Sequence, residues 1–520
     1  MKGEKSQGKV AKYLPSGVLM KKGVVIGGGI AGLVSASVLA SKGYEITLLE
    51  RNVTLGGKLQ KLQVGEYTYD FGPTMITMPW VFERVFREAG KTVDPMLRFL
   101  PLTVTSRNFF GSGSMMDLSS DAKHMLDQLD KFSPENREGF LAYLHEIERI
   151  YKVVAENFFE NPVVEWSDYF SPTLLKSLLS VHPFQSMDHF HRTFFDDSRL
   201  VAMMNRYATY IGSSPYQTPA TLSWIAYLEL VQGAFYIEGG NYRLIESFER
   251  LARSVGVKIY KSTPAEEILS ANGVVTGVRT EDHVWEADFV ISNVDVRTTK
   301  EQLLSQTNRS SKHSNPSMSG FITLLGINKK FPHLHHHNLF FPENYGREFV
   351  DIFDLREWSL SPAIYVCNSS FSEYDRAPKE GSNLYIQINV PANEGNQREE
   401  SWFDRYYQYR ENIVYWLEND WGLKGLEESI EEERFYGPKE IEEMSGAWQG
   451  SIHGPVFHGK GAFLRPPMKD PRIEGLYYTG GSTHPGGGTP MAALSGLTIA
   501  QIIERKRKQD VTSYLRKSGS

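Results

Sequence analysis

Residues 23–32 read Gly-Val-Val-Ile-Gly-Gly-Gly-Ile-Ala-Gly, a short apolar run that passes directly into a glycine-rich turn. The apolar run is typical of a central strand in a parallel sheet, buried on both faces. The turn fits the pattern G-x-G-x-x-G at Gly27, Gly29 and Gly32, and a helical pattern and a second apolar run ending at Glu50 follow it. This order of strand, turn, helix, strand and acid predicts a βαβ unit that binds a dinucleotide.

Each glycine of the turn has its own physical role. Gly27 permits the tight turn, Gly29 lets the backbone approach a pyrophosphate, and Gly32 lets the helix pack closely on the strand. A helical pattern follows through Leu33, Ala36 and Ala40. The free N–H groups and the positive dipole end of this helix favour phosphates, and the turn residues Ile30 and Ala31 are expected to take part in cofactor binding. We therefore expect an α/β protein with a Rossmann-like domain. The alternative is a glycine-rich turn that binds no ligand.

A second set of candidate residues follows directly. Glu50 is placed to accept hydrogen bonds from a ribose. Beyond it, Gly56 and Gly57 allow the chain to run close to a cofactor, and Arg51 or Lys58 is available for a phosphate. A tight, backbone-rich stretch comes next, at Gly72, Pro73 and Thr74.

The C-terminal region supplies a matching half. An apolar run there predicts a strand that ends at Gly480 and Gly481, and a loop that exposes its backbone continues to Gly488. Thr489 is expected as an N-cap and Pro490 as the first helical residue. A second helix N-terminus would then point at something electron-rich, such as a reduced flavin ring.

These motifs resemble the flavoprotein superfamily of amine oxidases and carotenoid desaturases, in which E-R-x-x-x-x-G-G-[KR] follows the Rossmann unit. More narrowly, residues 480–490 are similar to the G-x-x-T-H-P-G-x-G-x-P loop of the bacterial-type phytoene desaturase family. That family of carotenoid oxidoreductases includes the diapophytoene desaturase and diaponeurosporene oxidase branch. Further blocks of the family match in the same order along nearly the whole chain, at residues 70–74, 236–240, 287–293, 336–338 and 362–366.

The resemblance implies a fold, a cofactor and a substrate. The fold is the Rossmann-like FAD-binding domain of the superfamily with a mixed-sheet and helical substrate domain. The cofactor is FAD, held by both ends of the chain and, without a cysteine in the C-terminal loop, not covalently. The substrate is an acyclic carotenoid, and the electron acceptor is oxygen or a quinone. The implied location is cytoplasmic, peripheral on the inner face of the cell membrane.

The expected domain organisation alternates between cofactor and substrate regions. We expect a basic tail, three FAD-binding parts of which the last ends in a helix, a helical substrate region and a substrate domain. The basic tail covers residues 1–22, and the FAD-binding parts cover residues 23–100, 236–310 and 436–520. The helical substrate region covers residues 101–235, and the substrate domain covers residues 311–435.

Two activities of the family compete for this chain. One is desaturation along the polyene, by a phytoene or diapophytoene desaturase, and the other is oxidation of a terminal methyl to an aldehyde. The P-G-G-G-x-P-M run at residues 485–491 resembles the terminal oxidases, whereas the Thr483-His484 pair is the desaturase form. Gly487, in place of an alanine, would remove a methyl where the substrate meets the flavin. We favour terminal oxidation, with a thirty-carbon substrate.

His484 is the candidate catalytic residue, because an imidazole beside the flavin can accept a proton near neutral pH. The alternative is that it only orients its loop. Two other classes of protein also remain. An amine oxidase would share the fold, although nothing in the sequence distinctively supplies a site for a cationic substrate. A non-enzymatic prenyl-protein escort would lack a working flavin site, and the intact glycines at both ends argue against it.

Composition excludes several functions. The chain has 520 residues, a formal net charge of −6 and one cysteine, Cys367. The near-neutral balance argues against dedicated nucleic-acid binding. A single cysteine excludes an intramolecular disulfide and suits a reducing cytoplasm. Residues 1–22 are basic and too broken for a signal peptide or membrane span. This tail and the basic run at residues 505–508 are expected to be solvated, or else to contact anionic lipid.

A histidine-rich stretch is the remaining feature that invites a function. It comprises His333, His335, His336 and His337. We expect a loop or strand edge and no metal, because neighbouring side chains need not converge and no cysteine or clear set of carboxylates is near in sequence. Cys367 is expected to be a buried packing residue.

Overall fold

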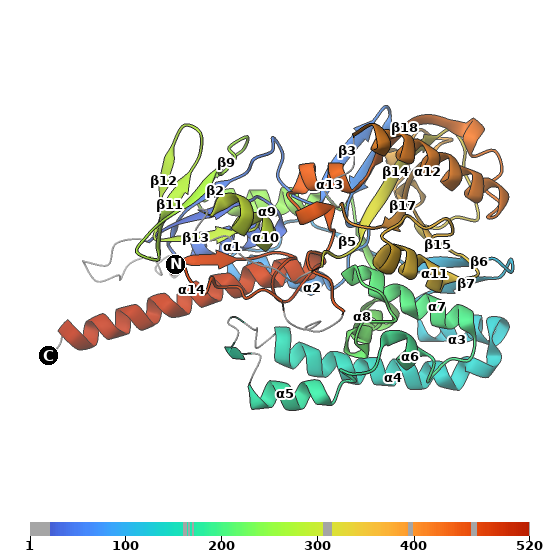
Figure 1. Ribbon diagram of the computed structural model, residues 1–520, viewed down its shortest axis with the longest axis horizontal. Coiled ribbons are helices and arrows are strands. Elements are labelled where there is room, and N and C mark those ends of the chain that lie inside the picture. The colour runs from blue at the N-terminus through green and yellow to red at the C-terminus, as the bar shows by residue number, and fades with distance from the viewer. Residues whose placement is uncertain are drawn as a thin grey trace, which may run out of the picture.

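The computed structural model describes residues 21–518 except 160–163, 165–166, 169–170, 305–314, 394–398 and 459–464. Most of the predicted basic tail, residues 1–20, therefore lies outside the described residues. Figure 1 shows a parallel sheet with its helices on one side of the molecule, a second large sheet on the other, and a layer of helices below the second sheet. These parts correspond to the predicted α/β fold with a mixed-sheet and helical region, which is confirmed.

The first sheet is wholly parallel and is assembled from distant parts of the chain. Its strand order is β19-β13-β1-β2-β9, and every neighbouring pair is parallel. The strands are β1 (Lys22–Ile26), β2 (Glu45–Leu49), β9 (Lys258–Tyr260), β13 (Phe289–Ser292) and β19 (Leu476–Tyr478).

Both faces of this sheet are covered, which explains the uninterrupted apolar run in β1. Val25 packs in the cluster that includes the helices, whereas Val24 and Ile26 pack on the opposite side against a small antiparallel sheet. That small sheet contains β10 (Glu267–Ala271), β11 (Val274–Arg279) and β12 (Val284–Glu286). The helices on the other face are α1 (Ile30–Ser41), α2 (Pro79–Glu88), α9 (Arg243–Ser254) and α14 (Thr489–Ser518).

The second sheet has seven strands in the order β18-β14-β17-β16-β15-β6-β7. Phe321 and Leu325 on β14 pack toward α12 (Glu399–Asn419), and Ile322 and Leu324 pack on the opposite face toward Tyr69. Tyr69 belongs to a hairpin formed by β3 (Gln60–Val64) and β4 (Tyr67–Phe71). The strands of the large sheet are β6 (Ser106–Phe110), β7 (Met115–Leu118), β14 (Ser319–Ile327), β15 (His337–Phe341), β16 (Ile364–Asn368), β17 (Ser382–Val390) and β18 (Ile430–Tyr436).

The stretch that was expected to be helical, residues 101–235, contributes β6 and β7 to that sheet before its helices begin. The strands β5 (Phe99–Pro101) and β8 (Phe235–Ile237) pair with each other at the two ends of this stretch. Its helices are α3 (Ala122–Phe132), α4 (Arg137–Val154), α5 (Pro172–Leu179), α6 (Met187–His191), α7 (Ser198–Asn205) and α8 (Trp224–Tyr227). Three short helices complete the fold elsewhere, α10 (Val296–Thr298), α11 (Tyr345–Val350) and α13 (Pro438–Ser445).

The contact between α1 and α14 joins the two ends of the chain. Gly496 on α14 lies so close to α1 that a Cβ atom there would be 2.6 Å from the carbonyl oxygen of Ala31 and 3.0 Å from Val34 Cβ. The neighbouring Ser495 is fully buried, and its hydroxyl accepts a hydrogen bond of 2.7 Å from the backbone N–H of Gly480. The helix is thereby fixed both to α1 and to the loop after β19.

We predict that Gly496→Ala destabilises the protein. A glycine-to-alanine change inside a helix ordinarily stabilises by about 0.5–1 kcal/mol, but the added methyl must displace backbone here. We expect a loss of about 1–3 kcal/mol, the usual cost of overpacking, measured by urea denaturation. Arg505→Ala, at an exposed position of the same helix, is the control and should change stability by less than about 0.5 kcal/mol. A Gly496→Ala protein as stable as the parent would contradict this account of the contact.

Candidate active site

A cavity of about 550 Å³ lies where the glycine-rich segments from both ends of the chain meet. The structure places all the predicted cofactor residues on its wall except Gly32. Those on the wall are Gly27, Gly29, Ile30, Ala31, Glu50, Arg51, Gly56, Gly57, Lys58, Gly72, Pro73, Thr74, Gly480, Gly481, Gly488, Thr489 and Pro490.

Two of the glycine segments are hydrogen-bonded to each other at the start of α1. The backbone N–H of Gly56 donates to the carbonyl oxygen of Gly28 at 3.0 Å, and Gly29 and Gly56 form an isolated parallel bridge. A Cβ atom on Gly29 would lie 2.9 Å from Asn293 Nδ2 and would occupy the wall of the cavity. The missing side chains thus leave a backbone-lined cradle beside a helix N-terminus, the kind of surface that accepts a phosphate.

Gly32 contributes by packing and does not line the cavity. A Cβ atom on Gly32 would be 2.1 Å from the carbonyl oxygen of Gly27, so no other residue fits between α1 and the turn. Gly27 itself has a φ of +96°, a left-handed conformation that favours glycine.

Glu50 follows β2 and is almost fully buried at the edge of the cavity. Its two carboxylate oxygens accept hydrogen bonds from the backbone N–H groups of Gly28, at 2.7 Å, and Asn52, at 2.9 Å. A carboxylate has about four acceptor positions, so these bonds fix its orientation and leave capacity for a ribose hydroxyl.

Lys58 is half-buried, whereas Arg51 is exposed and turned toward α13. The ammonium group of Lys58 donates to the carbonyl oxygens of Ser451, at 3.1 Å, and Ile452, at 2.6 Å. Burial lowers the pKa of Lys58 to about 8, a shift that nearby Asp295 opposes. The guanidinium of Arg51 donates to carbonyl oxygens of α13, so Lys58 is the better placed of the two cations to meet a bound group.

The helix at the C-terminal side of the cavity begins one residue earlier than expected. α14 starts at Thr489, and the backbone N–H of Ala492 donates to the carbonyl oxygen of Gly488, which therefore occupies the cap position predicted for Thr489. Gly487 packs directly on His453, because a Cβ atom there would be 2.9 Å from His453 Nδ1. An alanine at this position would push His453 within the cavity wall.

His484 is buried but is not among the residues that line the cavity. Its ring lies 5.5 Å from the ring of Phe158, and burial lowers its pKa to about 4. The neutral ring is a weak base behind the wall. Direct proton transfer to His484 therefore stays a prediction, and the geometry favours the alternative in which it orients the loop.

Sequence reasoning missed several residues of the wall. Asn293 follows β13 at the carboxyl end of the parallel sheet, and its Nδ2 donates to the carbonyl oxygen of Gly27 at 3.2 Å. The position of Asn293 directly after a parallel strand could have predicted this role, because ligands bind beyond the carboxyl ends of such strands. His453 and the buried pair Arg206 and Glu229 also line the cavity. They carry no local motif and meet it only through tertiary structure.

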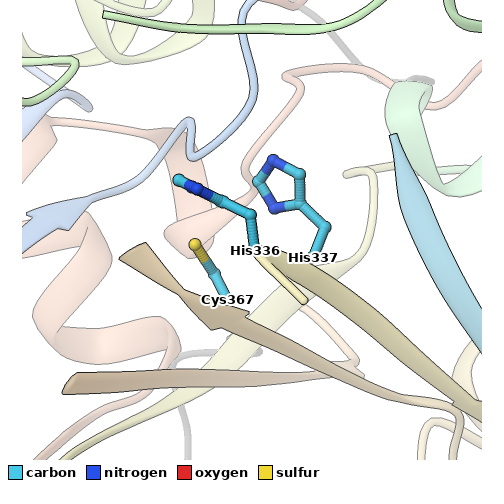
Figure 2. A group of neighbouring side chains, drawn as sticks. All are labelled: His336, His337 and Cys367. Atoms are coloured by element: carbon cyan, nitrogen blue, oxygen red, sulfur yellow. The ribbon is translucent and has the colours of Figure 1, made fainter. Parts of the chain in front are cut away.

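The histidine-rich stretch departs from expectation in one respect. His336, His337 and Cys367 lie side by side, as Figure 2 shows. One potential ligand atom of each lies within 4.8 Å of the others. The reason is strand register, because His337 on β15 is paired with Cys367 on β16. Cys367 is buried as predicted. Arg376 lies close enough to help burial lower the pKa of His336 to about 3, and this cation disfavours a metal ion there.

Comparison with known proteins identifies the family. Residues 30–503 match the family described as flavin containing amine oxidoreductase. The chain belongs to this family. Among curated members, it is 33% identical to a 1-hydroxycarotenoid 3,4-desaturase of Flavobacterium sp. (strain P99-3), over 93% of this chain and 99% of the relative. It is 32% identical to a 4,4'-diapolycopene oxygenase of Methylomonas sp, over 92% of this chain and 97% of the relative.

Solved structures of other proteins agree with this chain in fold. An oxidoreductase from Methanosarcina mazei has a TM-score of 0.60 at 16% identity, over 92% of this chain and all of that one. Cyclohexylamine oxidase from Brevibacterium oxydans has a TM-score of 0.58 at 14% identity, over 94% of this chain and all of that one. At these identities the likeness shows the fold alone.

The protein is thus an FAD-dependent oxidoreductase, and its residues fit the cofactor. The Gly29 cradle and the start of α1 would hold the pyrophosphate, Glu50 the ribose, and Lys58 and the start of α14 the flavin end. Cys367 is not among the cavity-lining residues that the structure describes, which agrees with non-covalent attachment.

We predict that Gly29→Val abolishes FAD binding, because the branched side chain would fill the cradle and press on Asn293. Flavin content should fall to near zero, measured by absorbance of the supernatant after acid precipitation, which should release all the flavin from the parent protein. Ile30→Val, which changes the next residue of the same wall to the same side chain, should keep its flavin. Yellow colour retained by Gly29→Val would contradict the assignment of the cradle.

Proposed function

We propose that this flavoprotein oxidises an acyclic carotenoid and takes it from a membrane. Its curated relatives carry carotenoid names of two kinds, a desaturase and several oxygenases, at 30–33% identity over most of the chain. These names support the substrate class for this chain without distinguishing between the two activities.

The apolar continuation of the cavity is the observation that carries the proposal. Beyond the glycine cradle, the same cavity runs into the helical region, where its wall is built of large apolar side chains. These are Met75, Ile211, Leu222, Trp224, Ile225, Leu228, Leu339 and Phe457. A long hydrocarbon chain fits such a wall, because a hydrocarbon has no hydrogen-bonding groups and is favourably removed from water by apolar side chains.

The carboxylates on the wall argue against a cationic amine as substrate. Glu50 accepts two backbone N–H groups, and Glu229 is paired with Arg206 at 3.0 Å. Asp295 accepts the backbone N–H of Arg297 at 2.9 Å. Each carboxylate of the described cavity wall therefore already has a partner. An amine oxidase needs a site that stabilises its cationic substrate, and none of these groups is free to provide it.

The chemistry needs little from the side chains beyond positioning. For desaturation, bound FAD would supply the acceptor for a hydride from a carbon next to the conjugated chain. Delocalisation along the polyene stabilises the positive charge left behind, so the neighbouring proton becomes acidic and needs no strong base. The apolar wall aligns the chain and excludes water, and His484 holds the loop that carries Gly486 and Gly487.

We favour oxidation of the terminal methyl over desaturation, with a thirty-carbon substrate. Oxidation of a methyl to an aldehyde consumes one O₂ and releases one water, whereas desaturation removes two hydrogen atoms and passes the electrons to oxygen or a quinone. The absence of a side chain at Gly487 supports the first reaction, because a methyl group there would press on His453, which lines the cavity, and so change its shape at the flavin end.

We predict that the purified enzyme converts a fully conjugated acyclic carotenoid to an aldehyde with consumption of oxygen. Chromatography of the products and an oxygen electrode would measure both. A less unsaturated precursor, run in parallel, tests the alternative, because a desaturase converts only that substrate and shifts its absorption to longer wavelength. Conversion of the precursor alone would overturn terminal oxidation and leave the carotenoid assignment in place. A Gly487→Ala variant should lose the oxidation to the aldehyde while it keeps its flavin.

An exposed apolar patch on the helical region supports contact with a membrane. Among the described residues no helix is long and apolar enough to cross a bilayer. Phe184 is 90% exposed and Leu179, at the end of α5, is 64% exposed. On its buried face α5 packs through Leu174 against Phe158. The ring centroid of the adjacent Phe159 lies 5.6 Å from that of the cavity residue Trp224. The patch thus lies outside the apolar wall of the cavity.

We predict that the protein floats with liposomes and that Leu179→Ser combined with Phe184→Ser reduces this recovery at least severalfold, because burial of two large apolar side chains contributes about 3–6 kcal/mol. Tyr415→Ser is the control. Tyr415 is 61% exposed on α12, which lies on the opposite side of the molecule from α5 in Figure 1. Equal flotation of the two variants would exclude this patch as the contact.

A further inference from the structure

A buried cluster of charged and phenolic groups interrupts the apolar wall of the cavity. Arg206 and Tyr210 lie in the 3-10 turn Arg206–Ile211, and Glu229 lies in the π-helical turn Leu228–Gln232. The guanidinium Nη2 of Arg206 donates to Glu229 Oε2 at 3.0 Å, and the side chains are only 5% and 2% exposed. Arg206, Tyr210 and Glu229 all line the cavity.

The hydrogen-bonding capacity of this cluster is unequal. Glu229 accepts from three donors, because the hydroxyl groups of Tyr207 and Tyr210 also bond to its oxygens. Arg206 has five N–H donors, and its Nε has no partner in the described structure. Most acceptor positions of the Glu229 carboxylate are therefore occupied. Arg206 still has an N–H group that could donate a hydrogen bond to a further oxygen atom.

An ion pair in this position is costly unless it has a role. Removing two charges from water is expensive, and a buried pair is often no more stable than apolar side chains of similar size. The surrounding wall consists of residues such as Leu222, Ile225 and Leu228, which would pack equally well against an apolar replacement. The cluster therefore points to something that enters the cavity and is not a pure hydrocarbon.

The cluster also lies near the flavin end of the cavity. The hydroxyl of Tyr210 is 3.9 Å from the sulfur of Met75, the residue after Thr74. Thr74 is hydrogen-bonded to Tyr365 at 2.5 Å, and Tyr365 to His337 Nδ1 at 2.7 Å. Burial lowers the pKa of His337, with smaller contributions from His336 and Arg206, so this histidine stays neutral and adds no competing cation.

We infer that Arg206, Glu229 and Tyr210 form a subsite that binds an oxygen atom on the end group of the polyene, as a hydroxyl or an aldehyde. This inference rests on the proposed function and adds oxygen-bearing acyclic carotenoids to the ligands that the cavity binds. Arg206 donates to the oxygen, and the filled carboxylate of Glu229 keeps the guanidinium in place. For terminal oxidation, the first round would place one atom of O₂ on the methyl carbon and release the other as water, using two electrons from the reduced flavin. The same subsite would then hold the alcohol for a second round, which forms the aldehyde and returns two electrons to the flavin.

The test compares binding of three ligands to the flavin-loaded protein in detergent: an acyclic carotenoid hydrocarbon, its terminal alcohol and its terminal aldehyde. Dissociation constants come from quenching of protein fluorescence, so no turnover is needed. We expect at least one oxygenated ligand to bind at least about tenfold more tightly than the hydrocarbon, in line with a hydrogen bond to a charged group. Arg206→Met combined with Glu229→Leu removes both charges. In this variant the ratio of the dissociation constants for the hydrocarbon and the oxygenated ligand should fall to about one.

Two further variants keep the test sharp. Tyr210→Phe removes only one hydroxyl and should reduce the preference partly, even if the double variant folds poorly. Arg107→Met with Asp117→Leu removes a comparable ion pair of 2.7 Å that does not line the cavity and should keep the full preference. Equal affinity of the parent protein for all three ligands would overturn the subsite and leave the carotenoid function standing. Binding of none of them would overturn both proposals.

Discussion

Close approach of backbone to backbone, at positions where a Cβ atom is missing, is the constraint on which the structure depends. At Gly32 a side chain would meet the carbonyl oxygen of Gly27 at 2.1 Å, and at Gly496 it would meet that of Ala31 at 2.6 Å. These two contacts hold α1 against the turn after β1 on one side and against α14 on the other. Because both helix N-termini open on one cavity, their positive ends act together on whatever binds there.

The rest of the cavity is organised around the contrast between this polar end and an apolar one. Near the glycines, backbone N–H groups, Glu50 and Lys58 provide hydrogen bonds and charge. Further along, Trp224 and its neighbours provide apolar surface, which the buried Arg206–Glu229 pair interrupts. The first environment suits a flavin and the second suits the hydrocarbon chain of the proposed substrate. A reaction between the two would require that they share one enclosed space from which water is excluded.

The sequence was informative where chemistry is carried by neighbouring residues. The glycines of residues 27–32 and the helix after residue 488 could be predicted because turn, strand and helix signals are local. Arg206 and Glu229 were missed because they reach the cavity only through tertiary packing, whereas the position of Asn293 directly after a parallel strand was a signal that could have found it. The meeting of His337 and Cys367 depends on the register of two strands, which a sequence pattern does not specify. His484 was a reasonable candidate for a proton acceptor, because it carries an imidazole, but its place behind the cavity wall is seen only in the folded structure.

The sheet order has a consequence for how this protein matures. The last strand, β19, joins the sheet beside β13, and the cradle built at Gly29 is completed by residues 480–490. During synthesis, β1, α1 and β2 emerge early, yet the cavity stays open until β19 and the start of α14 have left the ribosome. Contacts of such long sequence separation form slowly. Flavin capture is therefore a late event, and the apolar half of the cavity needs protection from aggregation until it occurs.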